Sequence, residues 1–339
     1  MSLLEPWILF RLIAGIVAAV FFVRAAVVAL RVLRYFDASR ATEGQLALER
    51  QLELSSTFAR IAAVLQAGVL ALTVVAADRL SRGVRGAMCA YGVFRANEWG
   101  PRALLVTAAV AIAAGVLSQL YAMDTRVRGM DLARPIAAAT IAMAPLAILD
   151  FAVTSMFLGK LDLTVTASCC SVQLDSASSA ASSYASGPRL LAATLAPLAI
   201  ALSVGIALLA ARKPRPPLVV LAGGLSLATL PIAVAAAVLE VAPYAFEVPQ
   251  HACPFCLLKA DAFFLGYPLF ASIVVAVVWG LGAGGAALLA RGPAAHAAFS
   301  SFASERLRLG AVAWLVALVI GVAPVVRYAI LSGGGSLFR

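Results

Sequence analysis

The feature that most constrains this chain is a series of long apolar runs that recur along the whole sequence. A helix needs about 20 consecutive apolar residues to cross the hydrocarbon core of a bilayer. About eight segments meet that requirement, and they lie near 7–32, 60–77, 102–123, 135–158, 190–211, 217–239, 262–290 and 309–330. The pattern predicts an all-α, polytopic transmembrane helical bundle that forms a single integral membrane domain over 1–339.

The composition supports this fold class and excludes a nucleic-acid-binding protein. Hydrophobic residues make up 63% of the chain and charged residues only 12%, whereas soluble domains carry about 25% charged residues. The net charge of +10 comes from arginines at the ends of apolar runs, where they anchor helices. No soluble domain carries a basic stripe of the kind that binds nucleic acid, so the expected partner is the lipid bilayer.

The loops between the spans set the expected orientation. The odd-numbered loops hold more Lys and Arg than the even-numbered loops, which predicts odd loops in the cytoplasm and both termini outside. Segment 34–59 mixes charged residues with leucines and is predicted to be an amphipathic surface helix. Segment 160–189 is rich in serine and alanine and is predicted to be a flexible extracytoplasmic loop.

All five cysteines fall in even-numbered loops: Cys89 in the second, Cys169 and Cys170 in the fourth, Cys253 and Cys256 in the sixth. They are therefore expected on one face of the membrane, the extracytoplasmic face, where disulfides persist. Cys169 and Cys170 are adjacent, and neighbouring Cα atoms lie only about 3.8 Å apart. That separation is too short for a relaxed disulfide between them.

The sharpest motif is His251-Ala252-Cys253-Pro254-Phe255-Cys256. A C-x-x-C spacing can close a small reversible disulfide or grip a metal ion. A helix that starts near Cys253 would favour its thiolate, and Pro254 suits a first helical turn.

The Cys-Pro-Phe-Cys tetrapeptide resembles the active-site motif of glutaredoxin and thioredoxin-like oxidoreductases. The chain also resembles, in mechanism, the membrane disulfide-forming enzymes of the DsbB and vitamin K epoxide reductase type. That resemblance implies a thiol–disulfide oxidoreductase in which Cys253 is the reactive thiolate and Cys256 its resolving partner. Cys169 and Cys170 would be the relay, a membrane quinone the acceptor, and an extracytoplasmic thiol protein or other membrane subunits the partners.

Three short motifs together resemble an uncharacterised family of bacterial multi-pass membrane proteins. They are Gly86-Ala87-Met88-Cys89, Ser168-Cys169-Cys170-Ser171 and the His-x-Cys-Pro-Phe-Cys run. This resemblance implies a place in the bacterial inner (cytoplasmic) membrane and carries no activity with it.

Two alternatives use the same cysteines. His251, Cys253, Cys256 and Cys89 could bind a soft metal ion such as copper, zinc or mercury, because thiolate and imidazole are the ligands such ions prefer. The chain could instead be a structural membrane subunit whose cysteines form disulfides only.

Polar residues inside the spans form a further set of candidates, since ionisable groups at membrane depth are functional candidates by default. Asp150 lies about 12 Å from the outer end of its span. Arg11 and Arg327 lie near the same side on the first and last spans, so either is expected to pair with Asp150. The glycine cluster Gly280–Gly285 indicates close helix contact.

Overall fold

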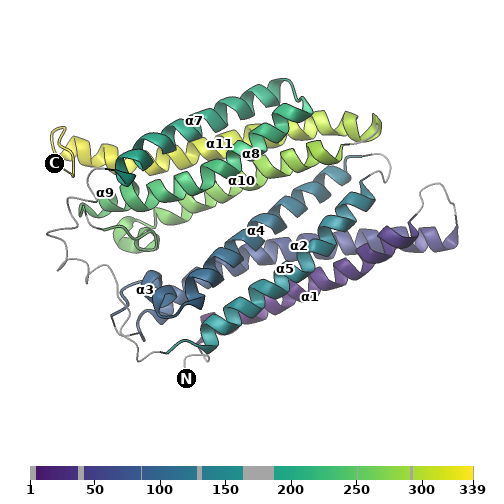
Figure 1. Ribbon diagram of the computed structural model, residues 1–339, viewed down its shortest axis with the longest axis horizontal. Helices are drawn as coiled ribbons and strands as arrows, with labels where there is room; N and C mark the ends of the chain where they lie inside the picture. The colour runs from purple at the N-terminus through teal and green to yellow at the C-terminus, as the bar shows by residue number, and fades with distance from the viewer. Residues whose placement is uncertain are drawn as a thin grey trace. The chain divides into compact units, whose positions relative to one another are not determined.

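The computed structural model describes residues 5–36, 42–84, 86–127, 132–162, 187–249, 251–290 and 293–338. Over these ranges the chain consists of helices and turns without a strand (Figure 1). Eight helices are long and apolar enough to cross a membrane, which confirms the predicted all-α polytopic class. The helices are α1 (Pro6–Tyr35), α2 (Glu43–Leu80), α3 (Ala90–Arg95), α4 (Trp99–Asp124), α5 (Ala133–Gly159), α7 (Pro188–Arg212), α8 (Pro216–Ala236), α9 (Ala242–Phe246), α10 (Gly266–Leu289) and α11 (Pro293–Leu331), with short turns η3 (Ala237–Val241), η4 (Cys256–Leu258) and η5 (Ala260–Ala262).

The chain divides into two compact units. Unit 1 comprises Met1–Ala167 with Gly285–Phe302, and unit 2 comprises Ser168–Gly284 with Ala303–Arg339.

Unit 1 is built on four long helices. α1 packs against α2 and α5, and α4 packs against the same two helices. Small buried residues such as Ala18, Ala25 and Ala62 let the helix backbones approach closely, which is how helices associate in lipid. The Ser55 hydroxyl also donates to the Ala25 carbonyl at 3.3 Å, so a polar contact joins α2 to α1.

Glycines bring the helices of unit 2 together. A Cβ built on Gly223 of α8 would lie 2.8 Å from the Gly280 carbonyl oxygen of α10. Ser226 donates to the Ala276 carbonyl at 3.2 Å and accepts a hydrogen bond from the indole of Trp314 at 3.0 Å. The close helix contact predicted from the glycine cluster is therefore confirmed at Gly280.

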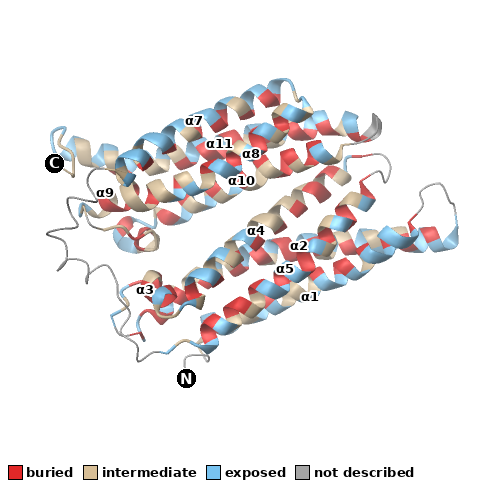
Figure 2. Cartoon of the chain, in the orientation of Figure 1, coloured by how far each residue is buried: buried red, intermediate tan, exposed pale blue. Residues whose placement is uncertain are grey.

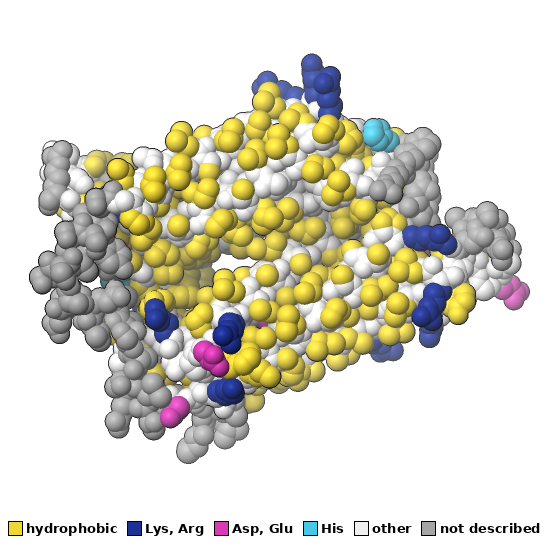
Figure 3. Space-filling view, in the orientation of Figure 1, with side chains coloured by type: hydrophobic (Ala, Val, Ile, Leu, Met, Phe, Trp, Pro, Cys, Tyr) yellow, Lys and Arg dark blue, Asp and Glu magenta, His cyan; other side chains and the backbone are white. Residues whose placement is uncertain are grey.

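The outer surface of the helices is apolar, as a bilayer environment requires. Figure 2 shows exposed residues along the outward sides of the long helices. Large hydrophobic side chains such as Leu105, Leu198 and Val319 are exposed there. On the face that Figure 3 shows, hydrophobic side chains cover most of the surface of the long helices, as expected for helices in contact with lipid.

The second span differs from its expected form. Residues 43–59 are helical, but they continue into the span without a break, so α2 is 38 residues long. Leu48 packs in a cluster with Val32 of α1, with Phe36 directly after that helix and with Ala137 of α5. Residues 43–59 are therefore part of the same helix as the second span, with Leu48 packed against other helices and Leu46 and Leu54 exposed.

Candidate functional site

The dithiol motif forms a turn in unit 2 between α9 and α10. Cys253 precedes the turn formed by Pro254 and Phe255, and Cys256 begins the short helix η4. The two Sγ atoms lie within 4.8 Å of each other, and both side chains are buried. At that separation a modest side-chain rotation would close a disulfide. Two thiolates that share a tetrahedral zinc ion lie at a similar distance, about 3.8 Å apart.

Tight backbone packing holds this turn against the start of α10. A Cβ on Gly266 would lie 3.0 Å from the Leu257 carbonyl carbon and 2.7 Å from Leu258 Cδ2, so only glycine fits there without a shift. Before Gly266, Phe263 and Phe264 both adopt left-handed backbone conformations, with φ of 53° and 56°. These residues turn the chain from η5 into α10.

This geometry corrects two expectations. Ala262 does not begin the seventh span, because the left-handed phenylalanines delay the start of α10 to Gly266. The expectation of a helix that starts near Cys253 is also wrong. Cys253 lies outside any helix, and η4 contains three residues only. A helix dipole therefore does not act on this thiol.

The predicted thiol site also includes His251, Cys89, Cys169 and Cys170. The His251 imidazole lies against the Phe246 ring, with ring centroids 4.2 Å apart. Cys89 belongs to unit 1, where it is buried at the N-terminal end of α3. Cys169 and Cys170 lie outside the described residues, as does most of the 160–189 segment.

Unit 1 contains a buried ion pair within its helices. Arg11 of α1 and Asp150 of α5 are each 1% exposed. Arg11 Nη2 lies 3.0 Å and 3.2 Å from the two carboxylate oxygens of Asp150. Asp150 lies about 13 Å along α5 from the C-terminal end of that helix. The ion pair therefore lies within the span, where each charge neutralises the other.

Polar side chains from the other helices complete the network around this ion pair. The carboxylate of Asp150 also accepts hydrogen bonds from Gln66 Nε2, at 3.0 Å, and from the Thr107 hydroxyl. The guanidinium of Arg11 donates to Thr73 Oγ1 at 3.0 Å and to Thr154 Oγ1 at 2.7 Å. The network thereby joins α1, α2, α4 and α5 through their most buried polar groups.

One edge of the guanidinium lies against backbone. Arg11 Nη1 has no hydrogen-bond partner among the described residues, and a Cβ on Gly15 would lie 3.0 Å from it. Glycine one turn along α1 therefore leaves the space that this arginine occupies.

The sequence identified part of this network. It named Arg11 and Arg327 as possible partners of Asp150, and the structure contains the Arg11 pair. Arg327 instead lies 3.7 Å from Glu247 in unit 2. Gln66 and the three threonines were missed, because hydroxyl and amide residues are common in spans and only the rotation of each helix decides which of them face inward.

No protein-family model matches the chain, and no curated protein or solved structure matches it either.

Proposed function

We propose that this protein is a membrane thiol–disulfide oxidoreductase whose redox centre is the Cys253–Cys256 pair. The observation that carries the proposal is the distance of at most 4.8 Å between the two sulfurs, within one buried turn of unit 2. The C-x-x-C spacing supports the same chemistry, because it closes a small disulfide that reopens readily.

The reaction balances with a membrane quinone as oxidant. The two thiols lose two protons and two electrons and form one S–S bond, and the quinone gains both to become the quinol. A thiolate of an extracytoplasmic protein then attacks the Cys253–Cys256 disulfide, and a second thiol of that protein releases it, which leaves the substrate oxidised and the pair reduced. Cys169 and Cys170 are proposed to relay this exchange between the substrate and the buried pair.

A soft-metal site is the second candidate, and the burial of both thiols favours it. Cys253 is 0% exposed and Cys256 9% exposed, which suits a small ion better than direct attack by another protein. Two thiolates at this separation are a suitable fragment of a copper or zinc site. Cys89 and His251 stay predicted ligands of that ion.

One experiment separates the two functions. Full-length protein in lipid nanodiscs is treated with a short-chain quinone, alkylated with a maleimide, digested and analysed by mass spectrometry. For the redox function, quinone converts the Cys253–Cys256 peptide to a form that has lost two hydrogens and resists alkylation, and dithiothreitol restores it.

Cysteine-to-serine variants test which residues form the disulfide. Cys253→Ser and Cys256→Ser should each abolish the quinone-dependent change. A pair that stays alkylatable throughout the quinone titration would overturn the redox proposal. Protection by added Cu(I) or Zn²⁺ alone, reversed by a chelator, would establish the metal site instead.

A further inference from the structure

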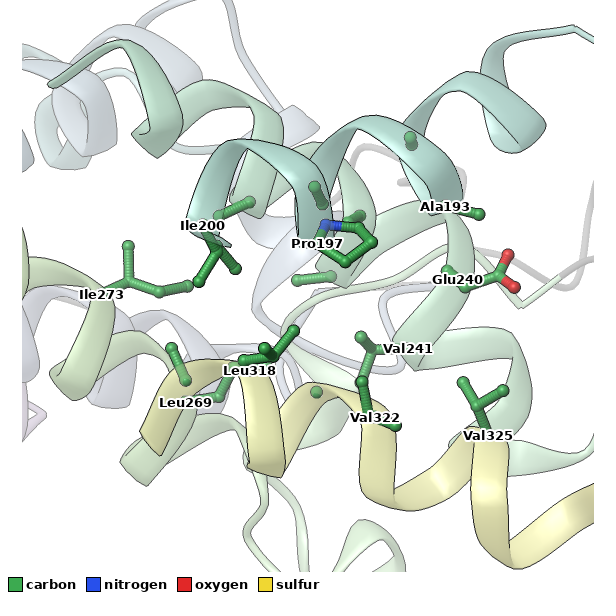
Figure 4. A pocket seen from close by; sticks show the side chains of 17 residues that line it. Ala193, Pro197, Ile200, Glu240, Val241, Leu269, Ile273, Leu318, Val322 and Val325 are labelled. Carbon is green, nitrogen blue, oxygen red and sulfur yellow. The ribbon is translucent and has the colours of Figure 1, made fainter. Parts of the chain in front are cut away.

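Unit 2 contains a cavity that the proposed dithiol chemistry does not use. It has a volume of about 180 Å³ and lies between α7, the junction of α8 and η3, α10 and α11 (Figure 4). Its wall is hydrocarbon apart from Glu240. Figure 4 shows Glu240 at the end of the cavity opposite Ile200 and Ile273.

The size of the cavity suits an organic ligand rather than water. A buried water needs two to four polar partners, and a dry apolar cavity of about 150 Å³ is large enough to bind benzene. This cavity is larger than that, with one carboxylate as its only charged group. An apolar ligand is therefore its natural occupant.

The shape of the cavity points to a chain rather than a compact ring. Its lining runs from Ala192 to Ile200 on α7 and from Ala317 to Val325 on α11. Each stretch is about 12 Å long at 1.5 Å per residue. A cavity of about 180 Å³ that extends over this length is narrow. It runs parallel to the helices, as lipid chains do.

A buried ion pair forms the polar end of the cavity. Glu240 accepts hydrogen bonds from Arg189 Nε at 2.7 Å and from Arg189 Nη2 at 3.2 Å. The Arg189 guanidinium also lies 3.3 Å from the centroid of the Phe338 ring. Both charged side chains are largely buried, so they form a fixed polar group beside an apolar slot.

The backbone is irregular at the same place. Glu240 lies on the π-helical turn η3, where the Ala242 amide donates to the Ala237 carbonyl. Pro243 follows and has no N–H to continue α-helical bonding. Such π turns inside longer helices frequently mark functional sites.

We infer that this cavity binds a single apolar tail of a membrane lipid, with the polar head of the lipid held at Glu240 and Arg189. The shared chemistry is a linear hydrocarbon chain that carries one hydrogen-bonding head. Lipids with an acyl chain and lipids with an isoprenoid chain both fit this description, and the experiment below distinguishes them. The inference does not depend on the redox or metal chemistry of the cysteines.

Two substitutions fill the cavity from opposite walls. A Cβ on Gly321 would lie 3.7 Å from Val241 Cγ2 and 4.0 Å from Leu269 Cδ1, which is ordinary contact, so Gly321→Leu extends into the cavity without displacing backbone. Ala196 lines the opposite wall on α7, so Ala196→Leu adds side-chain volume from that side. Ala323→Leu and Ala201→Leu are matched controls on the same two helices, at exposed positions outside the lining.

The test is photolabelling of the full-length protein in proteoliposomes. One arm uses a phospholipid with a diazirine in its acyl chain, and the other uses an isoprenoid alcohol with a terminal diazirine. After irradiation, labelled peptides are identified by mass spectrometry, with and without excess unlabelled lipid as competitor.

We expect saturable adducts on the lining of α7, η3 and α11 in at least one arm, and the labelled arm identifies the source of the chain. Gly321→Leu and Ala196→Leu should each lose these adducts, while Ala323→Leu and Ala201→Leu keep them. Adducts that persist in both filled variants, or a lining that stays unlabelled in both arms, would overturn the inference.

Discussion

Replacing Asp150 with alanine should strongly destabilise unit 1, because it leaves the Arg11 guanidinium buried without its counter-charge. Removal of one partner from a buried ion pair costs about 3–5 kcal/mol. The lost hydrogen bonds from Gln66 and Thr107 add less, since such bonds between membrane helices average about 0.6 kcal/mol. The unpaired charge therefore dominates the expected loss in the free energy of unfolding.

The measurement is unfolding of the purified full-length protein in mixed micelles as the fraction of denaturing detergent rises, followed by circular dichroism. Asp150→Asn keeps a hydrogen-bond acceptor but loses the charge, so it should retain most of the destabilisation. The double variant Arg11→Met, Asp150→Leu removes both charges and should lie within about 1 kcal/mol of the parent protein.

An exposed ion pair on the same unit provides the control. Arg102 and Glu98 lie 3.6 Å apart, and both side chains are more than half exposed. Glu98→Ala should therefore change the unfolding free energy by at most about 1 kcal/mol. If Asp150→Ala costs no more than Glu98→Ala, or if the double variant is as unstable as the single one, the reasoning about the buried charge fails.

Two further substitutions test the packing. Gly223→Val should cost about 1–3 kcal/mol through overpacking against Gly280, whereas Gly224→Val, which has nothing within 4 Å of its Cβ, should be neutral in the same unfolding assay. Equal costs would contradict the close α8–α10 contact. Asn97→Ala should cost about 0.5–2 kcal/mol, because Asn97 Oδ1 accepts hydrogen bonds from the amides of Trp99 and Gly100 at 3.0 Å and 3.1 Å. Asn97→Asp keeps an acceptor for those amides but loses the Nδ2 donor to the Phe157 carbonyl oxygen at 3.0 Å, so it should recover part of that loss, and a variant as unstable as the alanine would contradict this role of the Asn97 side chain.

The helical spans could be predicted because their signal is local. A run of about 20 apolar residues has few alternatives to a transmembrane helix, so the sequence was enough to place eight of them. The start of α10 could not be predicted in the same way. It depends on Gly266 meeting Leu257 and Leu258, which is a contact made by the folded turn and not a property of the apolar run.

The buried ion pair was predictable only as a set of alternatives. Span order placed Arg11 and Arg327 near the same side as Asp150, but sequence spacing does not determine how helices rotate about their axes. In the structure Arg11 faces Asp150, with space for its guanidinium provided by Gly15. The requirement to neutralise a carboxylate in lipid thus predicted that a partner exists, while packing determined which one.

Backbone irregularity in unit 2 is concentrated in the stretch from Ala237 to Leu265. Among the described residues, every non-glycine residue with a left-handed backbone lies in this stretch: Glu247, Phe263 and Phe264. The π turn that carries Glu240 lies at its beginning. Left-handed non-glycine residues persist only where the surroundings hold them. The same stretch contains the dithiol turn and the polar end of the cavity, so both proposed sites lie where the chain departs most from regular helix, which is where local structural rules are expected to yield to function.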